Sequence, residues 1–197
     1  MTDTPIVWNE FRIARAISLQ ILQRKCVVMV DRCNWTGCEC DVLAVTTDLR
    51  IIDVEVKISR ADLKVDGRKD KWWHHSVGGH YEPAPNGGRR WVPHPRVPRA
   101  WPPKVWKHYF ALPASIWDDS LYAALPSATS GVLLVSDQPG RRELAVRSIR
   151  RAKPNRDADR ISPAAAVDIA RLANLRMWDA YEGMATRTNQ SSSGLQT

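Results

Sequence analysis

Helical and strand-like patterns of apolar residues alternate along this chain. Apolar residues recur at helical spacing over residues 8–24, and again from Ser162 and Pro163 to about Tyr181. Short runs rich in β-branched residues predict strands at 26–30, 41–46, 51–58, 108–112, 131–136 and 143–149. A further helix is expected after Ser59, which can cap it, running to about Trp73. The length of 197 residues favours one domain over residues 1–185.

Two segments depart from this pattern. Seven of the thirteen prolines lie between Pro83 and Pro103, with four glycines nearby, so residues 76–104 favour neither a helix nor a central strand. We expect a long excursion from the core there. Residues 186–197 are polar and predict a disordered tail. The apolar face of the last helix is expected to comprise Val167, Ala170, Leu172, Leu175 and Trp178.

Acidic residues and a lysine interrupt two of the apolar strands. Alternate side chains of a strand share a face, so Asp53, Glu55 and Lys57 should project together. A tight hairpin at 47–49 would bring Asp41 of the preceding strand alongside. Polar groups in apolar strands cost free energy unless they are paired or coordinate an ion. The pattern therefore predicts a site, whereas a surface salt-bridge set is the simpler alternative.

This set of side chains suits phosphodiester hydrolysis. Mg²⁺ binds through one or two carboxylates plus water and phosphate, and Mn²⁺ can substitute. We expect Asp41 and Glu55 to hold the ion, with the backbone carbonyl of Val56 as a further ligand. Lys57 would orient the attacking water and offset charge in the transition state.

The same residues resemble the PD-(D/E)XK nuclease superfamily. The string Glu55-Val-Lys-Ile-Ser-Arg-Ala-Asp62, with Lys71-Trp72 and Tyr109-Phe-Ala-Leu-Pro113 beyond it, resembles its MmcB-like DNA repair branch from about Phe11 to Tyr181. The resemblance implies an α/β, three-layer restriction-endonuclease-like fold, a mixed central sheet flanked by helices. It also implies a Mg²⁺-dependent endo- or exonuclease with catalytic Asp41, Glu55 and Lys57.

Some residues keep two interpretations. Such folds often add an acid from the first helix, and Glu10 is the candidate, although an acid is also favourable in any first helical turn. Asp53 is either a third ligand or an acid at a strand start, and Asp62 is either part of the family string or a capping acid. The proline-rich segment has no counterpart in the compact branch of the family.

The net charge of +8 and pI near 9.6 favour a polyanionic partner, although a solvated basic surface also fits. Eight basic residues fall between Arg141 and Arg160, a pattern typical of phosphate contacts. The candidate nucleic-acid contacts are Lys64, Lys69, Lys71, Arg89, Arg90, Arg150 and Arg151. In the proline-rich segment, tryptophans interleave with arginines, which suits either base stacking or a protein interface.

The remaining sequence features bear on compartment and metal content. There is no apolar run long enough to span a membrane and no signal-like N-terminus, so we expect a cytoplasmic protein with reduced thiols. Cys26, Cys33, Cys38 and Cys40 lack the paired spacing of structural zinc sites, and buried thiols are favoured over zinc. The five histidines show no metal spacing; His74 or His75 is either a surface residue, which is favoured, or a group that moves protons or contacts DNA.

These observations lead to one expected function and one alternative. The first is a metal-dependent nuclease acting on DNA in repair, recombination or a phage or defence setting. The alternative is a non-catalytic nucleic-acid-binding or inhibitor protein that retains the fold. A homodimer or a protein partner could form through the proline- and tryptophan-rich segment.

Overall fold

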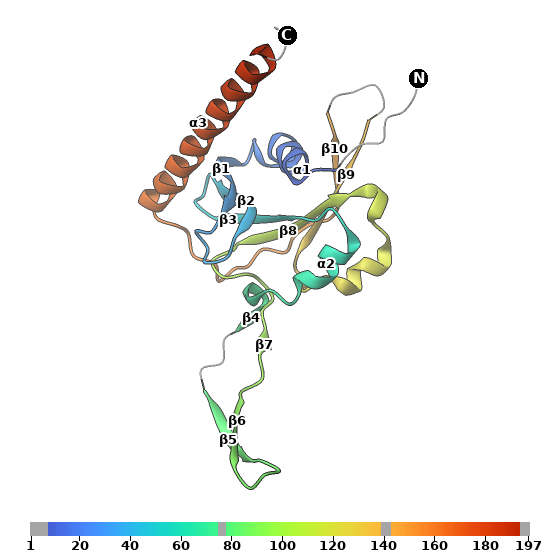
Figure 1. Cartoon of the computed structure of the whole chain (residues 1–197), viewed down its shortest axis with the longest axis vertical. Coiled ribbons are helices and arrows are strands. Elements are labelled where there is room, and N and C mark those ends of the chain that lie inside the picture. The colour runs from blue at the N-terminus through green and yellow to red at the C-terminus, as the bar shows by residue number, and fades with distance from the viewer. Residues whose placement is uncertain (1–7, 75–77, 139–142, 194–197) are drawn as a thin grey trace.

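A six-stranded mixed sheet forms the centre of the molecule in the computed structural model, which describes residues 8–74, 78–138 and 143–193 (Figure 1). The strand order is β1-β2-β3-β8-β9-β10. The strands are β1 (Cys26–Cys33), β2 (Cys40–Thr46), β3 (Ile51–Val56), β8 (Lys107–Pro113), β9 (Gly131–Ser136) and β10 (Ala145–Arg150). All six strands predicted from the apolar runs are therefore present, with shifted ends.

The sheet combines two kinds of pairing. Strands β1, β2 and β3 are antiparallel neighbours, β3, β8 and β9 are parallel, and β10 returns antiparallel to β9. The β2–β3 hairpin is closed by the backbone of Thr46 and Arg50, where the Thr46 N–H donates to the Arg50 carbonyl at 2.9 Å. Leu49 completes the turn with a φ of 61°. The predicted tight connection at 47–49 is thus confirmed.

Helices cover both faces of this sheet. Helix α1 (Glu10–Ile17) and the π-helical turn η1 (Ser18–Leu22) pack on one face, against apolar side chains such as Val54 and Val56. The other face carries α2 (Arg60–Asp66) and the 3-10 helix η4 (Asp119–Ala124) at one end, and the start of α3 (Pro163–Ser193) at the other. Strand alternation separates the two cores, because even-numbered residues of β3 meet α1 while Asp53 and Glu55 face the opposite way.

Three predicted helices have different ends in the structure. Asn9 caps α1 by accepting the Phe11 N–H at 2.8 Å, so the helix begins at Glu10 rather than at Trp8. Ser59 caps α2 as predicted, accepting the Asp62 N–H at 3.1 Å. This helix ends at Asp66, and the short 3-10 helix η2 (Asp70–Trp72) follows. The expected continuation to Trp73 is wrong because the chain turns at Gly67, the C-cap residue.

Helix α3 corrects two further predictions. It continues to Ser193, so residues 186–193 of the expected disordered tail are helical; no proline interrupts the backbone hydrogen bonds there. Residues 194–197 lie outside the described part of the chain. The predicted apolar face is only partly packed, because Val167 and Trp178 are 67% and 61% exposed. Ala166 and Ile169 contact the sheet instead.

The proline-rich segment leaves the sheet as an extended arm (Figure 1). Strands β4 (Trp73–His74) and β7 (Val97–Pro98) pair at its base, and β5 (Gly79–Pro83) and β6 (Arg89–Pro93) pair further out. The short 3-10 helix η3 (Ala114–Ile116) follows β8. Within the part of the chain that the structure describes, no helix is long and apolar enough to cross a membrane.

Candidate active site

The end of β3 brings the predicted carboxylate and lysine together in the protein interior. Glu55 and Lys57 are 1% and 3% exposed, and their side chains meet with Lys57 Nζ 3.1 Å from Glu55 Oε2. Residue 57 follows the last strand residue, and its N–H still donates to the Ala111 carbonyl of β8 at 2.8 Å. The predicted common face of Glu55 and Lys57 is therefore observed.

Asp41 lies where β2 begins, beside the end of β3. The antiparallel β2–β3 register pairs Val42 with Val54. The next residue of each strand is Asp41 and Glu55, so these two residues are neighbours. Its carboxylate accepts the Val56 N–H at 2.6 Å. Because the N–H and C=O of an extended residue point the same way, the Val56 carbonyl lies on the Asp41 side of β3. The hairpin thus brings Asp41 beside the end of β3, next to Glu55 and Val56.

The charge environment of Asp41 is strongly acidic. Burial raises its pKa from 3.8 to about 6, and the negative charges of Glu55 and Glu10 act in the same direction. The hydrogen bond from Val56 and the positive charge of Lys57 offset only part of this effect. Asp41 is therefore held among like charges, an arrangement that a bound cation would relieve.

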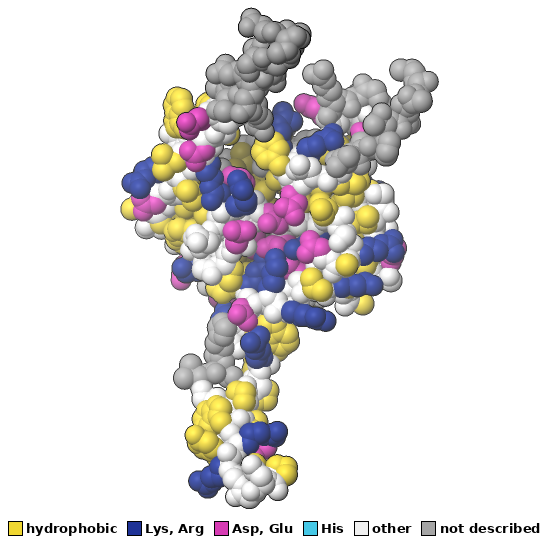
Figure 2. Space-filling view, viewed as in Figure 1, with side chains coloured by type: hydrophobic (Ala, Val, Ile, Leu, Met, Phe, Trp, Pro, Cys, Tyr) yellow, Lys and Arg dark blue, Asp and Glu magenta, His cyan; other side chains and the backbone are white. Residues whose placement is uncertain are grey.

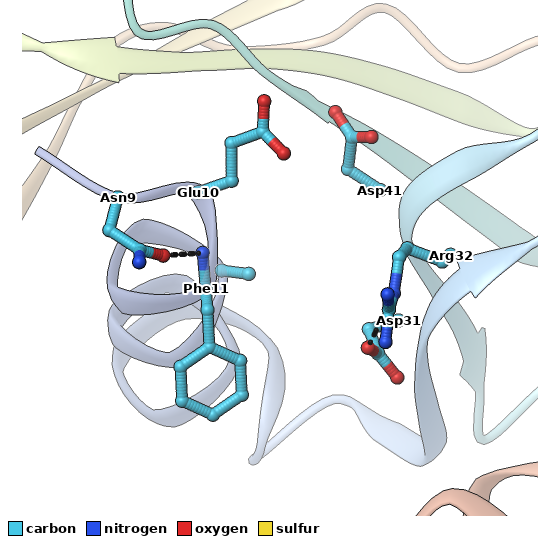
Figure 3. A pocket seen from close by; sticks show the side chains of 7 residues that line it. Asn9, Glu10, Phe11, Asp31, Arg32 and Asp41 are labelled. Carbon is cyan, nitrogen blue, oxygen red and sulfur yellow. Dashed lines mark hydrogen bonds and ion pairs between the residues drawn. The ribbon is translucent and has the colours of Figure 1, made fainter.

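Glu10 faces Asp41 across a surface pocket. Figure 3 shows the two carboxylates pointing toward one another, one from α1 and one from β2. The cavity measures about 260 Å³ and is lined by Asn9, Glu10, Phe11, Ala14, Asp31, Arg32 and Asp41. Arg32 adopts the left-handed backbone conformation with a φ of 46°. Three carboxylates and one guanidinium group therefore line the solvent-accessible side of the site.

Glu55 is surrounded by three lysine side chains. Lys57, Lys69 and Lys71 all place their ammonium groups against its carboxylate, with Lys69 Nζ 2.9 Å from Oε2. Burial by itself would raise the pKa of Glu55, but Lys71 and Lys57 outweigh burial and hold that pKa below its usual range. Glu55 is thus a stable anion in the folded chain.

Lys71 and Lys69 differ from each other in exposure. Lys71 is buried and contacts both Glu55 and Asp53, at 3.6 Å from the latter, so its predicted role as a surface phosphate contact is wrong. The cause is η2, which turns the side chain inward after α2 ends. Lys69 is half-exposed and contacts Glu55 and Asp66. It is the lysine of this group that can reach a ligand in solvent.

Asp66 belongs to this site, although no sequence motif identifies it. Its Oδ1 lies 2.8 Å from Lys57 Nζ and 3.0 Å from Lys69 Nζ, and its Oδ2 accepts the Trp72 indole N–H at 2.9 Å. It is fully buried on the inner side of α2 with Leu63. In the sequence, one sign of this role was available: Asp66 lies three positions after Leu63, so both fall on one side of a short helix. Asp62 also approaches Lys57, at 3.8 Å, in addition to following the helix cap.

Asp53, which the sequence left as either a third ligand or an acid at a strand start, is a buried acid. It is 1% exposed, and burial raises its pKa to about 6 although Lys71 opposes the shift. His108 lies 3.7 Å away and is also fully buried, in the strand predicted from the apolar run at 108–112. Burial holds the pKa of His108 well below 6.5, and its Nδ1 pairs with the Ser130 hydroxyl at 3.0 Å. Strand β8 carries His108 inward beside β3.

The other predicted phosphate contacts lie apart from this cluster. Lys64 is exposed on α2, and Arg151 is exposed after β10. Arg150 is half-buried, donates to the Ser130 carbonyl at 2.8 Å and lies 5.0 Å from the Tyr122 ring, so its guanidinium group packs the domain. Arg89 and Arg90 are exposed on β6 of the arm. Residues 141 and 142 of the basic segment lie outside the described residues.

The four cysteines do not converge. Cys33 and Cys40 are buried partners in the β1–β2 register, whereas Cys26 pairs with Thr46 at the far end of β1. All four are free thiols. Burial raises the pKa of Cys26 to about 11 and that of Cys40 further. Cys33 and Cys40 are therefore the buried thiols, whereas Cys26 and Cys38 are partly buried.

The donor set of the site suits a metal that needs few protein ligands. Within residues 8–74, 78–138 and 143–193, no group of three or more His, Cys, Asp or Glu side chains is arranged to hold an ion. Mg²⁺ needs only one or two carboxylates when water completes its shell. Asp41 and Glu55, with Glu10 opposite Asp41, would be the carboxylates for such an ion, which would have to displace lysine ammonium groups from Glu55. Figure 2 shows acidic side chains gathered near the middle of one face of the domain, with basic side chains below them.

Comparison with known proteins gives a limited result. No protein-family model and no curated protein matches this chain. Among solved structures, a protein of unknown function from Silicibacter pomeroyi is similar, with 16% sequence identity and a TM-score of 0.46. The similarity covers 93% of this chain and 94% of that chain.

Proposed function

We propose that this protein is a metal-dependent nuclease that hydrolyses DNA phosphodiester bonds, with a restriction-endonuclease-like arrangement of its mixed sheet and helices. The observation that carries the proposal is the meeting of Asp41, Glu55 and Lys57 at the adjoining ends of β2 and β3. Glu10, which faces Asp41 from α1, adds a fourth group at the same place (Figure 3). The motif resemblance to PD-(D/E)XK nucleases supports the same assignment.

Each residue has a distinct role in this proposal. Asp41 and Glu55, with the Val56 carbonyl, would hold Mg²⁺ or Mn²⁺, and Glu10 would bind through water. The ion supplies Lewis-acid activation of the phosphate and lowers the pKa of bound water. Lys57 offsets negative charge on the phosphate as the bond breaks. Asp66, 2.8 Å from Lys57 Nζ, positions that ammonium group from the inner side of α2.

Lys69 gives the site a contact for substrate. Its side chain is half-exposed and shares Glu55 Oε2 with Lys57. Both lysines also contact Asp66 Oδ1, at 2.8 Å for Lys57 and 3.0 Å for Lys69. Because Lys69 is the more exposed of the two, it would be the lysine that contacts a substrate phosphate from the solvent side.

A cleavage assay tests the proposal. Linear duplex, circular duplex and single-stranded DNA are incubated with wild type, Lys57→Ala and Glu55→Gln in Mg²⁺, Mn²⁺ or EDTA. Each variant should cleave at least about 100-fold more slowly, the usual loss when a group that stabilises the transition state is removed. Lys25→Ala, which removes an exposed lysine elsewhere, is the matched control and should cleave like wild type. Equal rates for wild type and Lys57→Ala would overturn the catalytic assignment.

One observation favours a second candidate function, nucleic-acid binding without cleavage. Three lysines already neutralise Glu55, as expected for a site that has exchanged its metal for ammonium groups. In that case wild type would bind DNA with the same affinity in Mg²⁺ and in EDTA, and neither Mg²⁺ nor Mn²⁺ would raise its melting temperature. Metal-dependent stabilisation together with cleavage would exclude this alternative.

A further inference from the structure

The outer part of the arm carries an aromatic pair on one of its faces. In the β5–β6 register, Tyr81 stands opposite Trp91, and their ring centroids are 5.0 Å apart at an interplanar angle of 67°. Both rings remain accessible, at 61% and 49% exposure. The Tyr81–Trp91 face, as we name it, therefore presents aromatic surface to solvent at a distance from the core.

A glycine shapes this face. A Cβ atom on Gly79 would lie only 2.6 Å from Cζ2 of Trp91 and would also overlap the Val92 carbonyl oxygen. The indole ring therefore lies across the backbone of Gly79, which holds it close to the ribbon instead of projecting freely. An aromatic ring placed over a strand glycine in this way is fixed in orientation. A fixed, accessible ring suits stacking with a flat ligand.

The charges of the ribbon indicate what the ligand is. Arg89 stands opposite Pro83, two positions along from Trp91, so its side chain is on the same face as the two rings. Glu82 and Arg90 face each other on the reverse side and approach to 3.7 Å. Glu82, the only acid in residues 79–93, thus lies on the opposite face. The Tyr81–Trp91 face combines two rings with a cation, which complements a base and its phosphate.

We propose that the Tyr81–Trp91 face binds single-stranded nucleic acid, with bases stacking on the rings and Arg89 contacting the phosphate backbone. Stacking on an aromatic side chain contributes about 1–3 kcal/mol per base and tolerates any base sequence. An unpaired strand is required because the bases of a duplex are already stacked on one another. This binding is independent of the proposed cleavage site, since the face shares no residue with Asp41, Glu55 or Lys57.

Fluorescence anisotropy with a labelled oligo-dT of about twenty nucleotides, in EDTA, tests the proposal on the full chain. Trp91→Ala and Tyr81→Ala should each weaken binding at least about 5-fold, the effect of losing one stacked base. Trp91→Phe should retain most of the affinity, because a ring remains. Gly79→Ala should weaken binding by displacing the indole ring. Trp178→Ala, which removes an accessible indole ring from α3, is the matched control and should bind like wild type.

Salt dependence separates the role of Arg89 from that of the rings. Arg89→Ala should reduce the slope of log affinity against log salt by about 0.7, the value for one phosphate contact on a single strand. Trp91→Ala should leave that slope unchanged. Equal melting temperatures for all arm variants would show that the domain is intact.

Several outcomes would overturn the proposal. These are no binding of oligo-dT by wild type, equal binding by wild type and Trp91→Ala, or equal affinity for a duplex of the same length. Concentration-dependent self-association that Trp91→Ala abolishes, with no oligo-dT binding, would assign the face to a second copy of the chain. Failure of the nuclease proposal gives a different result, because Lys57→Ala should bind oligo-dT normally whether or not wild type cleaves DNA.

Discussion

Replacing Asp41 with asparagine should stabilise the folded chain while removing the proposed cleavage activity. The asparagine side chain keeps the shape of the aspartate and an oxygen that can accept the Val56 N–H. What the Asp41→Asn substitution removes is a negative charge held beside Glu55 and Glu10. Under the proposed function Asp41 is a catalytic-site residue, and such residues commonly reduce stability.

The pKa of Asp41 sets the magnitude and the sign of the expected change in folding stability. Its pKa rises from 3.8 to about 6 on folding, so the folded chain binds this proton more tightly than the unfolded chain. The stabilisation that wild type gains from protonated Asp41 is complete below pH 3.8 and is lost as pH rises through about 6. A shift of about 2 units corresponds to about 3 kcal/mol at most. Because Asp41 is partly exposed, solvent screening reduces this to about 1 kcal/mol.

Thermal melts of wild type and Asp41→Asn in EDTA measure this effect. At about pH 8 the variant should melt about 2–4 °C higher, the shift for about 1 kcal/mol in a chain of this size. The difference should disappear near about pH 4, where Asp41 of wild type gains its proton. Adding Mg²⁺ should raise the melting temperature of wild type more than that of the variant. Asp179→Asn, the same charge change at an exposed site on α3, should show no such pH dependence.

Two results would refute this reasoning. A lower melting temperature for Asp41→Asn than for wild type under the alkaline condition would mean that the carboxylate stabilises the fold. A difference that is the same under the acidic and the alkaline condition would mean that charge repulsion is not its cause.

Three other measurements test the packing of the site and the core. Lys71→Met should lower the free energy of unfolding by about 3 kcal/mol in urea titrations, because it leaves Glu55 and Asp53 buried without their shared cation; an unchanged midpoint would contradict this. Gly131→Ala should cost about 1–3 kcal/mol in the same assay, since its Cβ would overlap the Tyr109 ring; wild-type stability would refute the close approach. Cys26 should react with iodoacetamide about 100-fold more slowly at neutral pH than a thiol of pKa 9.0, because its pKa near 11 leaves little thiolate. Mass spectrometry of the folded chain would show this, and rapid alkylation would disprove it.

The sequence by itself determined the strands and the central motif. Alternation placed Glu55 and Lys57 on one face of β3, and the residues at 47–49 predicted the hairpin that brings Asp41 alongside. Both inferences depend on local geometry, because side chains alternate in any strand and a short connection forces neighbouring strands to pair. Local patterns also predicted the Ser59 cap of α2.

Tertiary structure alone decided the partners of those residues. The inward turn at η2, which local sequence did not predict, moves Lys71 from an expected surface position to Glu55. Asp66 joins Lys57 because α2 packs its inner side over the end of β3, and the parallel pairing of β8 buries His108 beside Asp53. Such contacts join separate elements of the chain, and each depends on how those elements pack. Hydrophobic periodicity shows which side of an element is buried, but the charges that meet there are set by the packing of the whole domain.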